Sequence, residues 1–210
     1  MNIACLGWGS LIWCPQSLPL KPHRPPRWFT DGPELPVEFA RQSEDGRLTL
    51  VIVRPEAAEP RAVLLPVLWA NLTCPDIEEA HEALARRERK SQLPRTSQKW
   101  VKWKDEKIAY WPKLGSSYPH ALQIAAWANG KKLDGVVWTN LLAKYEGEDG
   151  RVPSLTEVLN YLKTLCGSNL SEAKKYVRNA PPQIRTNYRA AIESELGWTC
   201  DLSATQDEIC

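Results

Sequence analysis

A short glycine loop near the start of the chain has residue types that suit chemistry. Residues Ile3 to Leu6 form an apolar run that leads into Gly7-Trp8-Gly9-Ser10, the pattern of a buried strand that ends in a tight turn. The main-chain N–H groups of such a turn can hold a carboxylate or stabilise a developing oxyanion. The two glycines are also typical of a turn whose role is only structural.

The neighbours of this loop exclude two familiar uses of glycine loops. A dinucleotide-binding fingerprint needs a third glycine at position 12 and then a helix, but the chain has Ile12 there and Pro15 soon afterwards. A nucleophile elbow needs a glycine two residues after the serine, and Ser10 has none. The loop is therefore a candidate for binding through its backbone donors.

A second candidate is Glu88, near the end of a helix predicted over residues 76–90. The apolar stripe Ile77, Ala80 and Leu84 continues at i+4 to Glu88, so the inward face of this helix ends in a carboxylate. Burial raises the pKa of a carboxyl and makes it suitable as a general base near neutral pH, whereas neighbouring arginines act the other way. The alternative is that Glu88 lies at a frayed end, in solvent or paired with an arginine.

The glycine loop and Glu88 must be positioned by strands and helices that occur in mixed order along the chain. Strands are predicted over residues 3–6, 37–42, 48–53, 62–72, 100–103, 107–111 and 136–139. Asp45-Gly46 indicates a hairpin, and Pro66 requires a bulge or a sheet edge. Helices are predicted over 76–90, 120–129, 155–165, 171–178 and 182–196. We therefore expect an α+β protein whose last part is helical.

Residues 86–113 form a basic stretch that also carries tryptophans. Its cations are Arg86, Arg87, Arg89, Lys90, Arg95, Lys99, Lys102, Lys104, Lys107 and Lys113, and its tryptophans are Trp100, Trp103 and Trp111. Cations that follow phosphates and rings that stack on bases would suit single-stranded nucleic acid, or an acidic partner, in a non-catalytic binding module. The alternatives are a solvated hairpin with tryptophans facing the core, and a rim that recognises an anionic part of a substrate.

Composition narrows the class of protein. The chain has 210 residues, of which 43% are hydrophobic and 25% charged, so it is long enough to bury its own core. Its formal net charge of +2 requires no nucleic-acid partner. It has no run of 18 apolar residues, no signal-peptide pattern and no cysteine pair at zinc spacing. We therefore expect a cytoplasmic protein with no membrane partner and no metal.

Three segments together resemble the gamma-glutamylcyclotransferase superfamily. The loop Gly7-Trp8-Gly9-Ser10-Leu11-Ile12-Trp13 is similar to the glycine loop of its ChaC branch, in which a tyrosine stands where this chain has Trp8. Arg87-Glu88 resembles the second motif of that branch, a glutamate preceded by arginine. Phe39-Ala40-Arg41-Gln42-Ser43 is similar to the second strand of the family. The resemblance covers roughly residues 1–145.

The resemblance implies a fold and a reaction. The fold would be a small mixed β-barrel with packed helices over 1–145. Beyond the segment that the resemblance covers, the helical spacing after residue 154 predicts a helical extension over 146–198, followed by a loose tail over 199–210. The reaction would close 5-oxoproline from a gamma-glutamyl or related amine-bearing small molecule, with Glu88 as general base and acid and with no cofactor. The residues that would bind the substrate are Trp8, Gly9, Ser10, Leu11, Arg41 and Ser43.

Overall fold

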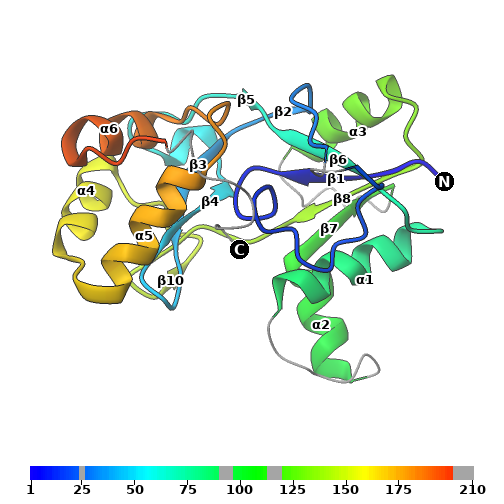
Figure 1. The fold of residues 1–210 in the computed structure, drawn as a ribbon, viewed down its shortest axis with the longest axis horizontal. Coiled ribbons are helices and arrows are strands. Elements are labelled where there is room, and N and C mark those ends of the chain that lie inside the picture. Colours follow the sequence, from blue (N-terminus) through cyan, green and yellow to red (C-terminus); the bar gives the residue numbers. More distant parts are fainter. Residues whose placement is uncertain (24–26, 90–96, 113–119, 201–210) are drawn as a thin grey trace. The chain divides into compact units, whose positions relative to one another are not determined.

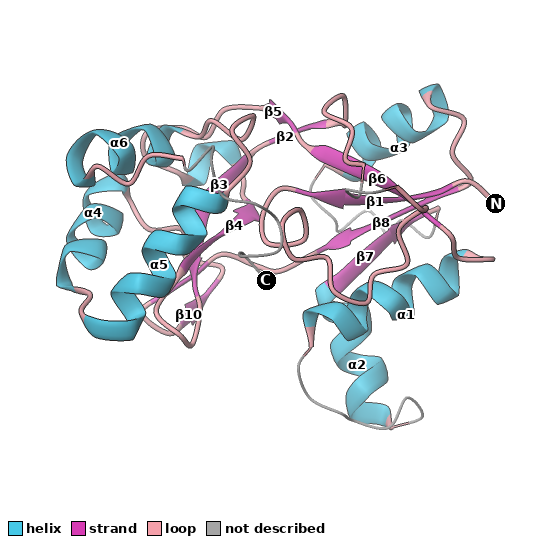
Figure 2. Ribbon diagram, viewed as in Figure 1, coloured by secondary structure: helices cyan, strands magenta, loops and turns pink. Residues whose placement is uncertain are grey.

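The fold is described by a computed structural model, which covers residues 1–23, 27–89, 97–112 and 120–200 (Figures 1 and 2). The chain forms two compact units, each built from three separate segments. The first unit consists of Met1–Gly7, Pro15–Pro33 and Val67–Leu141, and the second of Trp8–Cys14, Glu34–Pro66 and Leu142–Cys210. Residues 201–210, which make up most of the predicted loose tail, lie outside the described residues.

A four-stranded mixed sheet with the order β6-β1-β8-β7 forms the centre of the first unit. Strand β1 (Ile3–Gly7) pairs antiparallel with β6 (Leu68–Leu72) and parallel with β8 (Gly135–Thr139), which pairs antiparallel with β7 (Ile108–Trp111). Figure 2 shows β1 between β6 and β8. Every residue of β1 is buried, as expected for an apolar run in the middle of a sheet.

Helix α1 (Ile77–Glu88) lies against this sheet and contacts β7 and β8. It begins where the Asp76 side chain accepts a hydrogen bond from the Glu79 amide at 2.8 Å, a local signal that the sequence contains. Its apolar stripe is buried as predicted. Helix α3 (Ala121–Gly130) belongs to the same unit and confirms the helix predicted over 120–129.

Helix α2 (Gln98–Lys107) occupies residues for which a strand was predicted over 100–103, so that prediction is wrong. The Ser97 side chain accepts a hydrogen bond from the Trp100 amide and caps the helix. Trp100 and Trp103 fit the period of a strand poorly, since they are three residues apart and lie on one helical face. The strand predicted next along the chain is present as β7.

The second unit contains a four-stranded sheet with the order β10-β9-β3-β4 and a separate two-stranded sheet. The larger sheet is formed by β3 (Val37–Gln42), β4 (Leu48–Ile52), β9 (Lys144–Tyr145) and β10 (Glu148–Asp149). The Asp45-Gly46 hairpin joins β3 and β4 as predicted, with Gly46 at a φ of +79°. The smaller sheet pairs β2 (Glu34–Leu35) with β5 (Leu65–Pro66), which places Pro66 in an edge strand.

The second unit also contains a short 3₁₀ turn, η1 (Pro55–Ala57), and three helices. The helices are α4 (Leu155–Thr164), α5 (Gly167–Asn179) and α6 (Asn187–Leu196). A capping box between Ser154 and Glu157 starts α4, as the sequence predicts. Helix α6 contacts β3 and α5 contacts β4, so these helices cover the larger sheet of their unit (Figure 1).

The α+β class is confirmed, but the predicted small barrel is not formed by the described residues. A barrel requires the first and last strands of one sheet to pair with each other. Here the strands are divided among separate open sheets. The edge strands are β6 and β7 in one four-stranded sheet, and β10 and β4 in the other. The pattern of apolar runs identified the strands, but pairing between distant strands is not encoded in any local period.

Candidate active site

Glu88 is the last residue of α1 and is sheltered but not fully buried. Its side chain is 15% exposed, and its Oε1 accepts a hydrogen bond from Arg87 Nη1 at 2.8 Å. Arg87 is itself only 8% exposed. Glu88 is therefore mostly buried, as its place on the inward stripe predicts. It is also paired with an arginine, as the alternative interpretation predicts. In the described part of the chain, no second hydrogen bond to the Glu88 carboxylate is formed.

The Glu88 carboxylate acts electrostatically on the buried Cys5 thiol of the first unit. The Cys5 thiol lies on β1 with no exposed surface. Burial raises the pKa of this thiol far above its ordinary value, and the neighbouring Glu88 carboxylate raises it further, whereas Arg87 acts in the opposite direction. The Cys5 thiol is therefore held protonated and unreactive.

The glycine loop lies in the second unit and forms a tight helix-like turn. The Ile12 amide donates to the Gly9 carbonyl at 3.0 Å, and the Cys14 amide donates to the Ser10 carbonyl at 2.8 Å. The first amides of such a turn have no partner within it. The amides of Gly9 and Leu11 donate to no group among the described residues, so the loop has the backbone donors that the sequence predicts.

Trp8 anchors this loop to β4. Its indole Nε1 donates to the Leu50 carbonyl at 3.1 Å, and its side chain is buried. The Leu50 amide donates at 3.2 Å to the hydroxyl of Tyr176, on α5. The two aromatic side chains therefore form hydrogen bonds with the amide and the carbonyl of Leu50, on an edge strand. Trp8 thus has a structural role that the resemblance did not indicate.

Tyr176 is a residue near the loop that sequence reasoning missed. A side-chain carbon at position 9 would lie 2.4 Å from its hydroxyl, so the close approach requires Gly9. The Tyr176 ring packs edge-on against Trp13, with the ring centroids 5.3 Å apart. The helical spacing of Ala173 and Val177 could have predicted that this face of α5 is buried, but nothing in the sequence indicated that it would cover the loop.

Arg41 and Ser43 form contacts within the sheet and hairpin of the second unit. Arg41 Nη1 donates to the Leu142 carbonyl at 2.8 Å and lies 3.7 Å from Asp149 Oδ1. The Ser43 hydroxyl contacts the Asp45 carboxylate in the β3–β4 turn. Their predicted substrate contacts stay predictions. Glu88 belongs to the first unit and the other six predicted residues to the second, so the approach of Glu88 to the loop also stays a prediction.

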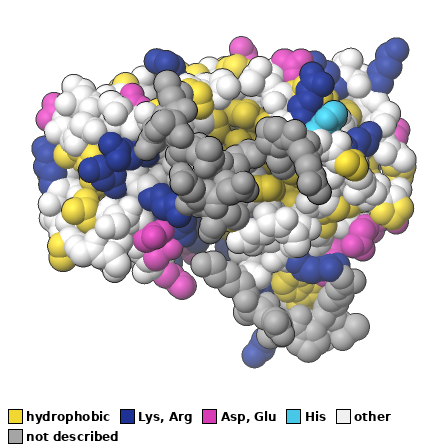
Figure 3. All heavy atoms as spheres, viewed as in Figure 1, with side chains coloured by type: hydrophobic (Ala, Val, Ile, Leu, Met, Phe, Trp, Pro, Cys, Tyr) yellow, Lys and Arg dark blue, Asp and Glu magenta, His cyan; other side chains and the backbone are white. Residues whose placement is uncertain are grey.

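The basic stretch uses at least one of its tryptophans in packing. Trp100 is only 3% exposed, and its Nε1 lies 3.1 Å from both carboxylate oxygens of Glu82, on α1. Lys104 lies 3.3 Å from the same carboxylate. On the face drawn in Figure 3, basic side chains lie in several separate groups. Binding of nucleic acid stays a prediction, and Lys90, Arg95 and Lys113 lie outside the described residues.

Glu38 is a fully buried carboxyl that the sequence analysis did not single out. Its oxygens accept hydrogen bonds from the Phe39 amide at 2.8 Å and the Tyr188 amide at 3.3 Å. Further bonds come from the Thr186 side chain and the Asn187 amide, at the start of α6. Burial raises the pKa of Glu38 to about 7, although these donors act in the opposite direction.

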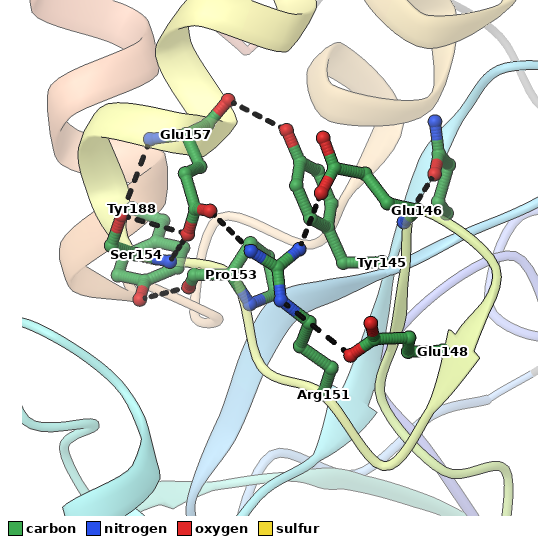
Figure 4. Close-up of polar contacts among 9 residues, drawn as sticks. Tyr145, Glu146, Glu148, Arg151, Pro153, Ser154, Glu157 and Tyr188 are labelled. Carbon is green, nitrogen blue, oxygen red and sulfur yellow. Dashed lines mark hydrogen bonds and ion pairs between the residues drawn. The ribbon is translucent and has the colours of Figure 1, made fainter.

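Arg151 joins the β9–β10 hairpin to the start of α4 (Figure 4). Its guanidinium contacts three carboxylates, those of Glu146, Glu148 and Glu157, and lies 4.7 Å from the centre of the Tyr145 ring. The close-up shows the acidic side chains arranged around the guanidinium. This arginine therefore has its acceptors within the fold and serves the structure of the second unit.

The described residues contain no group of three or more side chains that could hold a metal ion. None of the helices in the described ranges has the length and apolar character needed to cross a bilayer. Comparison of the chain with protein-family models, with curated proteins and with solved structures found no match in any of the three.

Proposed function

We propose that the chain is a gamma-glutamylcyclotransferase-like enzyme that closes 5-oxoproline from a gamma-glutamyl or related amine-bearing small molecule. The observation that carries the proposal is the state of the Glu88 carboxylate. It is sheltered from solvent, Arg87 holds one of its oxygens, and it accepts no other hydrogen bond from the described residues. A carboxylate in this state can accept a proton without losing a bond on which the fold depends.

The proposed reaction forms one C–N bond and breaks another. Glu88 takes a proton from the α-amine of the substrate, and the nitrogen attacks the γ-carbonyl carbon of the same molecule. The carbonyl oxygen then carries negative charge, for which the unused amides of Gly9 and Leu11 are suitable donors. The bond to the leaving amine breaks as Glu88 returns the proton to that amine. The products are 5-oxoproline and a free amine, and no oxidant or cofactor is consumed.

The test is incubation of the full chain with a panel of gamma-glutamyl amides, with 5-oxoproline measured by chromatography. We expect wild-type protein to form 5-oxoproline and Glu88→Gln to reduce kcat by about 100-fold or more, the range typical of a general base. Glu78→Gln is the matched control, because Glu78 is exposed on the same helix and the substitution removes the same charge. We expect it to behave as wild type.

Two results would overturn the proposal. One is the absence of 5-oxoproline with every gamma-glutamyl compound in the panel, although the protein is folded by circular dichroism. The other is turnover by Glu88→Gln at the wild-type rate. The cytoplasmic location and the division into 1–145 and 146–198 are separate predictions, which rest on the sequence pattern.

A further inference from the structure

Arg89 lies directly after Glu88, at the end of α1, and its guanidinium rests on two indole rings. The Arg89 Cζ atom is 5.1 Å from the Trp103 ring centroid and 5.8 Å from that of Trp100. Both distances are within the range of a cation–π contact. The Arg89 amide donates to the Ala85 carbonyl and closes the last turn of α1, so the backbone of this residue is also held.

The two indoles form a fixed platform. The Trp100 and Trp103 rings are stacked, with centroids 5.8 Å apart and an interplanar angle of 19°. Trp100 is buried, and its Nε1 is bonded to the Glu82 carboxylate. A planar guanidinium held on such a platform loses little additional freedom when it binds a ligand.

This guanidinium has no acceptor among the described residues. Arg89 Nη1 is buried without a hydrogen-bond partner, and Arg89 forms no ion pair in the described part of the chain. In α1, Glu88 accepts a hydrogen bond from Arg87, and Glu82 contacts Trp100 and Lys104; neither carboxylate forms an ion pair with Arg89 among the described residues. A buried charged donor without an acceptor is costly and is rare in folded proteins, so its presence suggests a ligand that supplies the acceptor.

We propose that Arg89 binds an oxyanion, namely a carboxylate on the leaving part of the substrate. This inference rests on the proposed function, in which Glu88 returns a proton to the leaving amine and its neighbour Arg89 faces the group attached to that amine. The residue as a whole is partly exposed, whereas its unpartnered Nη1 atom is buried. Its planar fork matches a carboxylate with two parallel hydrogen bonds, and it also matches a phosphate.

The experiment compares three substrates with the same gamma-glutamyl group. Gamma-glutamylglycine has a carboxylate on its leaving amine, gamma-glutamylethylamide has none, and the gamma-glutamyl amide of phosphoethanolamine carries a phosphate. For wild type we expect kcat/KM for gamma-glutamylglycine to exceed that for the ethylamide by about 10- to 100-fold, mainly through KM, as for a charge-assisted bond. A preference for the phosphate compound over gamma-glutamylglycine would overturn the assignment to a carboxylate.

Variants separate binding from folding. Arg89→Gln should remove the preference by lowering kcat/KM for gamma-glutamylglycine to the level of the ethylamide. Arg89→Lys should retain part of the preference, because the charge stays but the fork is lost. Arg86→Gln is the matched control, since Arg86 is an exposed arginine on the same helix. Wild type without a preference, or Arg89→Gln with an undiminished one, would overturn the inference.

The failure of the proposed function can be told apart from the failure of this inference. If none of the substrates yields 5-oxoproline, the proposed function is wrong, and Arg89 is then tested by tryptophan fluorescence with glutarate and inorganic phosphate as probes. Because the guanidinium lies on two indoles, glutarate should change the emission of wild type and of Arg86→Gln but not of Arg89→Gln. The absence of any response in wild type, or a response that Arg89→Gln keeps, overturns the inference.

Discussion

Glu38 and Glu88 are two largely buried carboxyl groups that accept different numbers of hydrogen bonds. Glu38 has no exposed surface and accepts hydrogen bonds from the amides of Phe39 and Tyr188. Glu88 is 15% exposed and accepts a hydrogen bond only from Arg87 within the described ranges. A carboxyl whose oxygens are all used holds the fold together, whereas one with an unused oxygen can exchange a proton with a substrate.

Arg151 and Arg89 differ in the same way. The guanidinium of Arg151 contacts three glutamates of its own unit, and that of Arg89 lies on two indoles without an acceptor among the described residues. Burial or charge alone does not separate the two members of either pair. The difference lies in unused hydrogen-bonding capacity, on which the proposed function and the proposed role of Arg89 both rest.

The largest expected effect is on kcat, and it separates Glu88 from Glu38. Glu88→Gln should lower kcat for 5-oxoproline formation by about 100-fold or more while the unfolding midpoint stays near that of wild type. Glu38→Gln should change the free energy of unfolding and leave kcat near wild type. Chemical denaturation and turnover are measured on both variants. The reverse pattern, with activity lost only in Glu38→Gln, would break the comparison.

The next effect is a pH dependence of stability that comes from Glu38. Burial raises its folded pKa to about 7 from an ordinary value of 4.5, so the folded protein binds the proton more tightly than the unfolded chain does. Its contribution to stability is therefore complete below about pH 4.5 and is lost as the pH rises through 7. The loss is on the order of 3 kcal/mol.

This pH dependence is measured as a difference between two proteins. The free energy of unfolding of wild type minus that of Glu38→Gln, followed by urea denaturation from pH 4 to 9, should fall across this range and level off above pH 8. Subtraction of the variant removes other titrating groups, such as the buried His81, whose pKa burial lowers. A flat difference would show that Glu38 has the same pKa in the folded and the unfolded protein, so that burial does not raise it.

A smaller effect tests the contact between Tyr176 and the glycine loop. Gly9→Ala should destabilise the protein by about 1–3 kcal/mol, because the new methyl group would lie 2.4 Å from the Tyr176 hydroxyl. Tyr176→Phe removes that hydroxyl, so the alanine should cost less in the double variant than in wild type. Equal costs in both backgrounds, measured by urea denaturation, would mean that the hydroxyl does not restrict position 9.

The smallest effect is expected at Arg151. Its ion pairs are solvent-accessible, so Arg151→Gln should lower the unfolding midpoint slightly at low ionic strength. The difference from wild type should shrink in about 1 M salt, where the Debye length is about 3 Å. Turnover should not change. A loss of activity in this variant would contradict its assignment as a structural arginine.

Local patterns predicted many of the elements that carry the candidate site. The apolar run before Gly7 predicted β1, the stripe from Ile77 predicted α1, and Asp45-Gly46 predicted the β3–β4 hairpin. Each depends on hydrophobic period, capping or turn geometry within a few residues. The strand predicted over 100–103 was wrong because the spacing of Trp100 and Trp103 fits a helix better than a strand, and because Ser97 caps the helix.

The sequence by itself determined that a strand, β1, leads into the glycine loop, that a helix, α1, begins close to Ile77, and that Glu88 continues the inward stripe of this helix. Only the tertiary structure decided that α6 covers Glu38, that the Tyr176 hydroxyl meets Gly9 and that Arg89 rests on Trp100 and Trp103. The physical reason is that periodicity tells which face of an element is buried. Which distant side chain meets that face, and which polar atoms are left without a partner, depends on how the whole unit packs.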